Sequence, residues 1–191
     1  MSKRRGVADK RERLRELKQR MEEHFSKLWF FTDEGGRLDG YLGTEPVMFV
    51  GIRPSTGRGG RAPQALGYFY RLLIEYGFSQ AHVTDVVKEQ MKTGLPSPEQ
   101  VERNWPFFLE ELRIVEPKHV VALGGWVFDT LRRRLDSPVP IRITHYSYRF
   151  CSRSKIEERL RADFERLKSI LEPGQVTTEA WISKSTLKLL V

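Results

Sequence analysis

Residues 47–51 read Val-Met-Phe-Val-Gly, a short apolar run that is closed by a glycine. A strand inside a parallel sheet has this pattern, because helices cover both of its faces and neither face meets water. Residues 82–87, 119–123 and 141–144 form three further runs with the character of strands. The sequence therefore predicts four short strands in one buried sheet.

Helical patterns separate these strands. Apolar residues recur every three or four positions between residues 65 and 76, and Gly77 follows where a helix commonly ends. Residues 97–100 and 154–157 both have the spacing of a capping box, which marks the start of a helix. Strand and helix alternate, with connections long enough for parallel strands. We predict an α/β fold, a three-layer α/β/α sandwich around a short four-stranded parallel sheet.

The chain has 191 residues and a mass of 22.3 kDa, the size of one domain. We divide it into an N-terminal basic amphipathic helix at 1–31, an α/β domain at 32–172 and a tail at 173–191 that packs on the body. The first segment places apolar residues at helical spacing among dense charges of both signs. We expect it to dock on the core as a solvated helix and not to reach for nucleic acid.

The composition restricts the classes of function. Lys and Arg number 33 against 25 Asp and Glu, a net charge of +8 that favours a polyanionic partner. Cys151 is the single cysteine, which excludes a disulfide framework, a four-cysteine iron–sulfur cluster and a classical zinc finger. The histidines lack metal-ligand spacing, and the sequence has no signal-peptide pattern and no run of about 18 apolar residues that could span a bilayer. We expect a cytoplasmic protein with no membrane partner and no metal.

The loops at the carboxyl ends of the strands are the expected place for a ligand, as in other open α/β sheets. The loop at 51–60 is rich in glycine and arginine, and no acidic residue occurs between Arg53 and Glu75. Its glycine spacing does not match a phosphate-binding P-loop, and no Lys-Ser or Lys-Thr pair follows. The composition of this loop favours an anion without identifying a mononucleotide.

The loop after the fourth strand carries His145 directly beyond the apolar run. The stretch 132–153 around it holds six Arg, one Asp and no Glu. Two basic loops at one edge of a sheet are typical of a groove that follows a phosphate backbone. We therefore expect a nucleic acid as the partner.

Four short motifs occur in the order and at the spacing of a known superfamily. They are Val47–Pro54, Thr84–Lys88, the segment from Pro106–Leu109 through Val120–Gly124, and His145–Ser147. With these motifs, roughly residues 46–170 resemble the uracil-DNA glycosylase superfamily.

The resemblance implies a monofunctional DNA glycosylase of base excision repair. Such an enzyme rotates a deaminated or damaged base, uracil or a related base, out of double- or single-stranded DNA and hydrolyses its bond to the sugar. We expect a monomer, and an enzyme that needs no metal or organic cofactor. Some members of the superfamily carry a four-cysteine iron–sulfur cluster, and the lone Cys151 excludes this chain from them.

The same resemblance assigns roles to individual positions. Arg53 falls in the loop that holds the attacking water, Asp85 where the family reads the edge of the base, and His145 where it stabilises the departing anion. Phe69, or its neighbour Tyr68, falls at the aromatic position that stacks on the base.

The remaining implied contacts surround the base and the DNA backbone. Residues 146–149 would form the loop that presses into DNA, with Arg149 or Tyr148 filling the space that the base leaves. The base would contact Gly51, Ile52, Pro54 and Ser55, and the DNA would contact Arg58, Arg61, Ser147, Tyr148 and Arg149.

Two positions depart from the family pattern. Arg53 stands where the family often has Asn or Asp, and a guanidinium only donates hydrogen bonds, so it cannot act as a general base. Asp85 stands where the family usually has Asn, and an ionised carboxylate would repel the O4 of uracil. Three hypotheses follow for Asp85: it is protonated, it reads a base that presents amino or imino donors, or it activates the water.

Two other functions are open, and the two departures could signify the first. The first is a catalytically weak or inactive nucleic-acid-binding protein on the same fold. The second is an enzyme that acts on a free nucleoside or nucleotide. A steep fall of affinity with salt would separate a DNA partner from a ligand with one phosphate.

Overall fold

The computed structural model describes residues 2–26, 28, 46–53, 62–89, 94–147 and 151–171. Four strands form one sheet in the order β2-β1-β3-β4, and every neighbouring pair is parallel. The strands are β1 (Val47–Gly51), β2 (His82–Asp85), β3 (His119–Leu123) and β4 (Ile141–Ile143). The predicted four-stranded parallel sheet is therefore confirmed.

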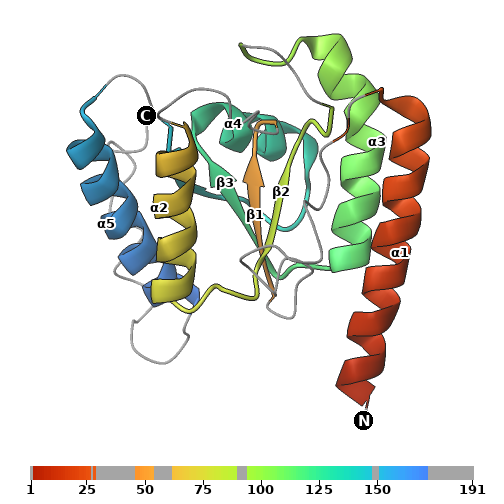
Figure 1. Ribbon diagram of the computed structural model, residues 1–191, viewed down its shortest axis with the longest axis horizontal. Helices are drawn as coiled ribbons and strands as arrows, with labels where there is room; N and C mark the ends of the chain where they lie inside the picture. The colour runs from red at the N-terminus through yellow and green to blue at the C-terminus, as the bar shows by residue number, and fades with distance from the viewer. Residues whose placement is uncertain are drawn as a thin grey trace.

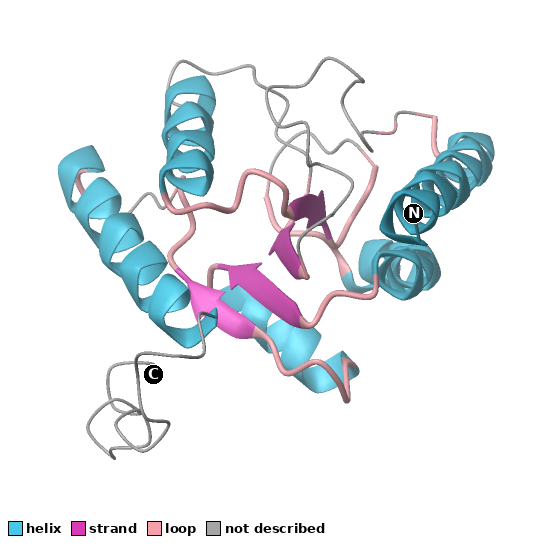
Figure 2. Ribbon diagram, turned by 90° about the horizontal axis from the view of Figure 1, so that it is seen from below, coloured by secondary structure: helices cyan, strands magenta, loops and turns pink. Residues whose placement is uncertain are grey.

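In the described residues five helices accompany the sheet, and Figures 1 and 2 show how they are arranged around it. They are α1 (Ser2–His24), α2 (Ala62–Glu75), α3 (Pro98–Val115), α4 (Gly125–Arg134) and α5 (Arg153–Leu171). Helices α2 and α5 pack on one face of the sheet, and α3 and α4 pack on the other, which gives the predicted α/β/α layers. Because neither face is left open, the sheet interior is apolar on both sides.

The central strand β1 supplies both halves of the core. Val47 and Phe49 pack into the cluster under α2 and α5, while Met48 and Val50 pack under α3 and α4. All five residues of β1 are buried. Successive side chains of a strand point to opposite faces, so a strand covered on both sides reads as a continuous apolar run.

Strand β2 ends at Asp85 and is shorter than the predicted run to residue 87. The backbone N–H groups of Val86 and Val87 still donate to the carbonyls of Gly51 and Ile52, at 2.9 and 3.0 Å. The chain thus continues beside the end of β1 although the regular ladder has stopped. Strand β4 likewise ends at Ile143, one residue before the predicted limit.

One predicted capping box is confirmed and the other is wrong. Ser97 caps α3: its hydroxyl accepts the Gln100 N–H at 3.3 Å, and the Gln100 side chain accepts the Ser97 N–H at 2.8 Å. Helix α5 instead begins at Arg153, so Ser154 lies within its first turn. The first hydrogen bond of that helix runs from the Ile156 N–H to the Ser152 carbonyl, at 3.1 Å. Gly77 follows α2 with φ +82°, as its position predicts.

Helix α1 lies outside α3 (Figure 1). Leu14, Leu17 and Met21 are fully buried and pack with Ile114 and Val115 of α3. This confirms a helix docked on the core by one narrow stripe, although it ends at His24 and not near residue 31. The predicted tail at 173–191 lies outside the described residues. No helix in the described part of the chain is long and apolar enough to cross a membrane.

Candidate active site at the carboxyl edge of the sheet

Parallel strands bring their carboxyl ends to one edge, which is the upper edge in Figure 1. Gly51 and Asp85 are register partners at the ends of β1 and β2. Gly124 follows β3, and His145 follows β4 two residues after its end. Four residues that lie far apart in the chain thus share one edge of the sheet.

Gly51 and Asp85 are in direct contact. A Cβ atom on Gly51 would lie 2.2 Å from Oδ1 of Asp85, so no larger residue fits unless the carboxyl moves. The two residues occupy matching register positions on adjacent strands, so their side-chain directions face the same side of the sheet, toward α2 and α5. The glycine therefore makes room for the Asp85 carboxyl.

The Asp85 carboxyl lies deep in the protein and keeps part of its surface accessible. Burial raises its pKa to about 7; Lys88 and Arg53 act to lower it, and Glu111 acts to raise it further. A group with this pKa changes its charge near neutral pH, and such groups are enriched at functional sites.

Two tyrosines stand near Asp85. Burial raises the pKa of Tyr70 and of Tyr146, and the negative charge of Asp85 raises both further. The pKa of Tyr146 is also raised by Tyr70 and lowered by Arg53. Helix α2, the loop after β1 and the loop after β4 therefore each place a polar side chain within electrostatic reach of Asp85.

Tyr70 was not among the predicted site residues, although it belongs to the aromatic run 68–70. Neighbouring residues of a helix point about 100° apart, so the three rings face three directions. Phe69 is 1% exposed and packs on Phe49 and Phe164 at centroid distances of 5.8 and 5.9 Å. Its ring has no free face for a base, so the predicted stacking role is wrong for Phe69.

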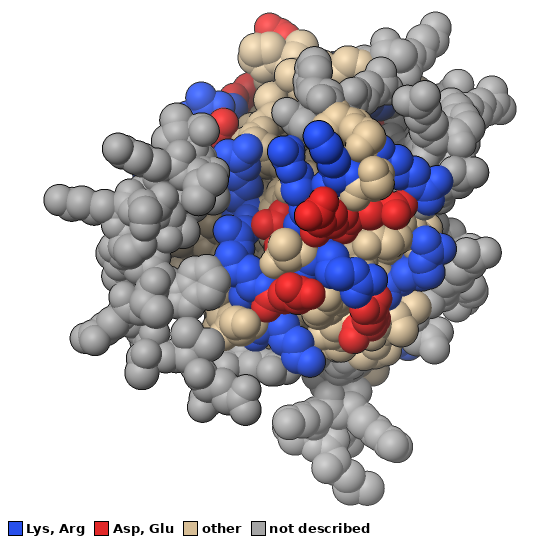
Figure 3. All heavy atoms as spheres, turned by 90° about the vertical axis from the view of Figure 1, so that its left-hand side faces the viewer, with Lys and Arg blue, Asp and Glu red and all other residues tan. Residues whose placement is uncertain are grey.

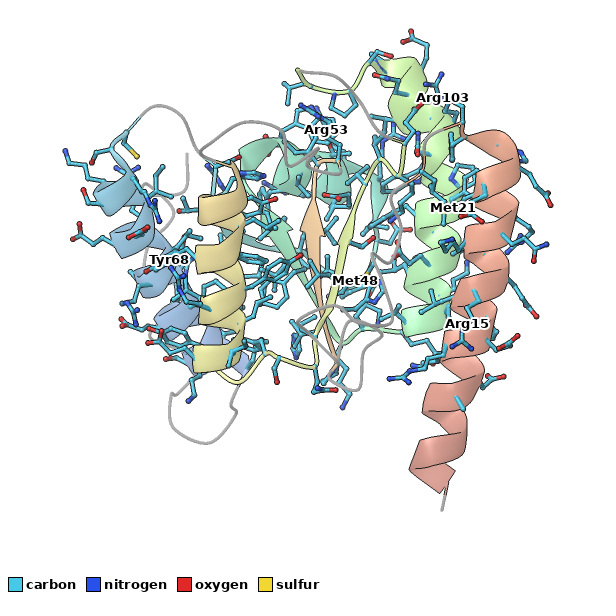
Figure 4. The ribbon with its side chains drawn as sticks, in the orientation of Figure 1. Arg15, Met21, Met48, Arg53, Tyr68 and Arg103 are labelled. Carbon is cyan, nitrogen blue, oxygen red and sulfur yellow. The ribbon has the colours of Figure 1, made fainter. Side chains whose placement is uncertain are left out.

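Tyr68 turns toward α5 and away from the sheet edge. Its hydroxyl donates to the carbonyl of Glu157 at 3.2 Å, and Figure 4 shows its side chain between α2 and α5. The alternative stacking residue thus contacts the neighbouring helix. The third aromatic residue, Tyr70, has its pKa raised by the negative charge of Asp85.

His145 is held by its neighbours in one orientation. Its ring stacks on Tyr146 with a centroid distance of 4.5 Å and an interplanar angle of 26°. Gly124 lies next to the His145 side chain: its φ is +90°, and a Cβ there would come within 3.1 Å of the His145 Cβ. Glycine at 124 thus allows both the backbone turn and the close approach of the imidazole.

The hydrogen bonds of His145 fix its tautomer. The Ser147 N–H donates to Nδ1 at 3.1 Å, and the Ser147 hydroxyl lies 2.9 Å from the same nitrogen. A backbone N–H only donates, so Nδ1 carries no proton and the proton of the neutral ring sits on Nε2. Burial lowers the pKa of His145 to about 4. At neutral pH the ring is therefore an uncharged hydrogen-bond donor.

These contacts revise the expected role of the loop at 146–149. The Tyr146 ring packs inward on Phe69, with a centroid distance of 5.3 Å, so Tyr146 does not project toward DNA. Ser147 donates a hydrogen bond to the His145 ring. Tyr148 and Arg149 lie outside the described residues, as do the predicted contacts Pro54, Ser55, Arg58 and Arg61.

Helix α5 anchors the start of this loop. Oδ2 of Asp163 accepts the Thr144 N–H at 2.7 Å. Arg166 donates to Oδ1 of the same carboxylate at 2.9 Å and to the carbonyl of Arg142 at 2.8 Å. The residue before His145 is thus bonded to a helix that packs on the sheet, which limits movement of the imidazole.

Arg53 lies at the end of the described part of the first loop (Figure 4). Its Nε donates to the carbonyl of Gly94 at 3.0 Å, which ties the loop after β1 to the segment before α3. Its charge lowers the pKa of both Asp85 and Tyr146. Ile52 next to it packs on the core under α3 and α4, so the base contact predicted for Ile52 is limited to its backbone and its partly exposed surface.

A second charged cluster lies on the opposite face of β2. Lys88 is buried, and its Nζ donates to the Thr84 hydroxyl and to the Asp85 carbonyl, both at 2.6 Å, and to Glu111. The other oxygen of Glu111 is 2.8 Å from Nε2 of His82. Burial alone would raise the pKa of Glu111, but Lys88 and His82 hold it below its usual range.

The sequence contains a signal for this second cluster. Glu111 lies three residues after Phe108 on the buried stripe of α3, where an acidic residue needs a partner. Lys88 directly follows two apolar residues at the end of a strand. In the described residues, no group of three or more His, Cys, Asp or Glu side chains could hold a metal ion.

The face over α2 and α5 carries charges of both signs (Figure 3). Arg161 pairs with Glu75, Arg166 with Asp163, and Arg153 with Glu157. Because carboxylates balance these arginines, this face is not a continuous basic surface. The cations that lower the pKa of Asp85 are Lys88 and Arg53, and neither belongs to α2 or α5.

Neither a scan against protein-family models nor a search of curated proteins gives a match to this chain. The chemistry of the site therefore has to follow from the residues at the carboxyl edge of the sheet. The structure brings Gly51, Arg53 and Asp85 together with Tyr70 and Tyr146, and it joins His145 to them through the Tyr146 ring.

Proposed function

We propose that the protein is a DNA glycosylase, similar in fold and site to the uracil-DNA glycosylase superfamily, that removes a deaminated or damaged base from DNA. The single observation that carries this proposal is His145. Its ring is neutral, and Ser147 occupies Nδ1, so Nε2–H is left to donate to a ligand at the sheet edge. A neutral donor suits a leaving group that becomes an anion.

The placement of the motifs supports the proposal. The glycine loop follows β1, the acidic position ends β2, a glycine follows β3 and the histidine follows β4. All four lie where open α/β sheets bind ligands. Asp85, Tyr146 and His145 are each surrounded by protein and still partly accessible, which is the combination that a concave site produces.

The reaction needs charge stabilisation more than covalent catalysis. The oxygen of a water molecule forms a bond to C1′ of the sugar while the bond from C1′ to the base nitrogen breaks. The electron pair of the broken bond leaves with the base, and the proton that the attacking water gives up passes to solvent water. His145 Nε2–H donates to the base oxygen on which the negative charge collects, and a preorganised donor of this kind contributes about 3 to 4 kcal/mol.

Asp85 and Arg53 take different parts in this reaction. Asp85 lies beside Gly51 at the end of β2, where a flipped base would meet its carboxyl. Arg53 is always charged and cannot accept a proton, so it suits a phosphate or the anionic base and not the activation of water.

Arg53 also favours a second candidate, a nucleic-acid-binding protein on the same fold that hydrolyses slowly or not at all. A cation beside the sugar opposes the positive charge that builds on C1′. The Gly94 carbonyl accepts a hydrogen bond from Nε of Arg53 and offsets part of this charge, which is why we place catalysis first.

Base release from single-lesion oligonucleotides tests the proposal. The panel carries uracil, hypoxanthine, xanthine or a thymine mismatch, in single- and double-stranded form, and free base is quantified by chromatography. We expect release of at least one of these bases by the wild type and a loss of about 10²- to 10³-fold in His145→Ala. His119→Ala is the matched control, because His119 begins β3 at the opposite edge.

One result would argue against hydrolysis, and another against the role of His145. Binding to DNA without release of any base, with equal affinity in His145→Ala, would favour the binding protein. Release that His145→Ala does not slow would remove His145 from the site.

A further inference from the structure

The Asp85 carboxyl has no hydrogen-bond donor among the residues that the structure describes. Within the described residues, no backbone N–H and no side chain donates to its oxygens, and Lys88 binds the Asp85 backbone carbonyl instead. A buried acceptor without a donor costs free energy unless a ligand satisfies it or it takes up a proton. The site is thus incomplete at this carboxyl.

The groups that face Asp85 come from every element around it. Gly51 presents its Cα, and Tyr70 and Tyr146 present phenols. Arg53 is the cation from the loop after β1, while Lys88 and Glu111 act from the opposite face of β2 as a pair whose charges offset each other. Among the effects of these groups and of burial on the Asp85 pKa, burial is the largest, and it raises the pKa to about 7.

A protonated carboxyl and an amide present the same pattern to a ligand. Each has one donor beside one acceptor on a planar group of the same size. An ionised carboxylate has acceptors only. The charge of Asp85 therefore decides which edge of a base it can bind.

Resting on the function proposed above, we propose that Asp85 recognises the flipped base as a neutral carboxylic acid, donating to a ring carbonyl and accepting from the adjacent ring N–H. The substrates of this class carry a carbonyl next to a ring N–H, as uracil, hypoxanthine and xanthine do. Cytosine and adenine present an amino group beside an unprotonated ring nitrogen, and the neutral acid matches that edge only in reversed orientation.

Recognition by the neutral acid makes the affinity fall as the pH rises. The acid form is nearly complete at pH 6 and is a few per cent of the total at pH 8.5 if the pKa is about 7. Because apparent affinity scales with the competent fraction, the Kd for the lesion rises about 30-fold between these pH values. In Asp85→Asn the donor and acceptor are permanent, so this change disappears.

Equilibrium binding and base release test this together. Fluorescence anisotropy gives the Kd for a duplex with one 2′-fluoro-2′-deoxyuridine, which resists cleavage, relative to the same duplex with cytosine, at pH 6 and pH 8.5. Single-turnover release from the cleavable uracil duplex is measured at the same pH values. Glu99→Gln is the matched control, because Glu99 is an exposed carboxylate at the start of α3.

We expect the lesion preference of the wild type and of Glu99→Gln to fall about 30-fold at pH 8.5, and that of Asp85→Asn to stay constant. The inference would be overturned if the lesion preference of Asp85→Asn fell by the same factor, or if the wild-type preference rose with pH. If base release is still observed in that case, the proposed function stands. The expected binding pattern without any base release would support the inference and contradict hydrolysis. Neither lesion preference nor release at either pH would overturn both.

Discussion

The two faces of β2 carry charged groups of opposite character. On the face toward α3, Lys88, Glu111 and His82 are buried and bonded to one another. On the face toward α2, the Asp85 carboxyl is partly accessible and accepts no hydrogen bond from the described residues. The cluster of Lys88, Glu111 and His82 is complete without a ligand and stabilises the end of the strand. The Asp85 carboxyl has no such partner among the described residues, so we assign recognition of the base to Asp85.

Removing Lys88 should have the largest effect. In Lys88→Met the Glu111 carboxylate stays buried with one partner fewer, and breaking such a pair costs about 3 to 5 kcal/mol of unfolding free energy. Urea unfolding at pH 7 measures this cost. The double variant Lys88→Met/Glu111→Gln should recover most of it, because no buried charge is left without its partner. A loss below about 1 kcal/mol in the single variant would show that the pair is not structural.

Replacing His145 should act on the rate and not on the fold. His145→Ala removes the Nε2–H donor and should slow base release about 10²- to 10³-fold. Its unfolding free energy should stay closer to the wild-type value than that of Lys88→Met. Single-turnover kinetics and urea unfolding on the same preparations separate the two effects. A variant that unfolds as easily as Lys88→Met would place His145 with the structural cluster.

Gly51→Ala tests the close approach to Asp85. The added methyl group would lie 2.2 Å from the carboxyl oxygen, so the Asp85 carboxyl or the strand end must shift, at a cost of about 1 to 3 kcal/mol. Gly67→Ala is the matched control, because a Cβ there meets nothing within 4 Å and alanine favours the helix by about 0.5 to 1 kcal/mol. Thermal unfolding of both variants should therefore shift in opposite directions. Equal shifts would contradict the contact.

Asp85→Asn should have the smallest effect on stability, and one that depends on pH. The pKa of Asp85 is raised in the folded protein from 3.8 to about 7. The folded state therefore binds more protons than the unfolded state between these values, and wild-type stability falls as the pH rises from about 4 to 7.

The amide cannot ionise, so Asp85→Asn should be more stable than the wild type at pH 8 and nearly equal at pH 4. We expect a gain of about 1 to 2 kcal/mol at pH 8, less than the full shift because the carboxyl is partly accessible, or roughly 2 to 8 °C in Tm. Thermal unfolding at both pH values checks the sign. Greater stability of the wild type at pH 8 would mean that the carboxylate has a cationic partner.

Much of the fold could be predicted because its signals are local. The apolar run of β1 and the capping box at Ser97 depend on a few neighbouring residues, and parallel connections then bring the strand ends to one edge. The placement of Asp85 and His145 at that edge followed from the same reasoning. The predicted start of α5 was wrong because Ser152 and Ser154 both suit the N-cap position. The structure shows that the helix begins after Ser152.

The site could not be predicted in full because its details depend on direction and on tertiary contacts. Phe69 and Tyr70 are adjacent in sequence, and the rotation of α2 alone decides that one enters the core and the other faces Asp85. The tautomer of His145 depends on the conformation of the next two residues. Lys88 and Glu111 are 23 positions apart, and charged residues are usually exposed, so their pairing required the fold.

A carbon-detected NMR titration of the side-chain carboxyls tests the difference between the two faces of β2 most directly. Asp85 should titrate near pH 7 in the free protein, and Glu111 should remain ionised below the range in which glutamates usually titrate. An Asp85 carboxyl that titrates near 4, like an ordinary surface aspartate, would contradict the assignment of this carboxyl as the neutral group that recognises a base.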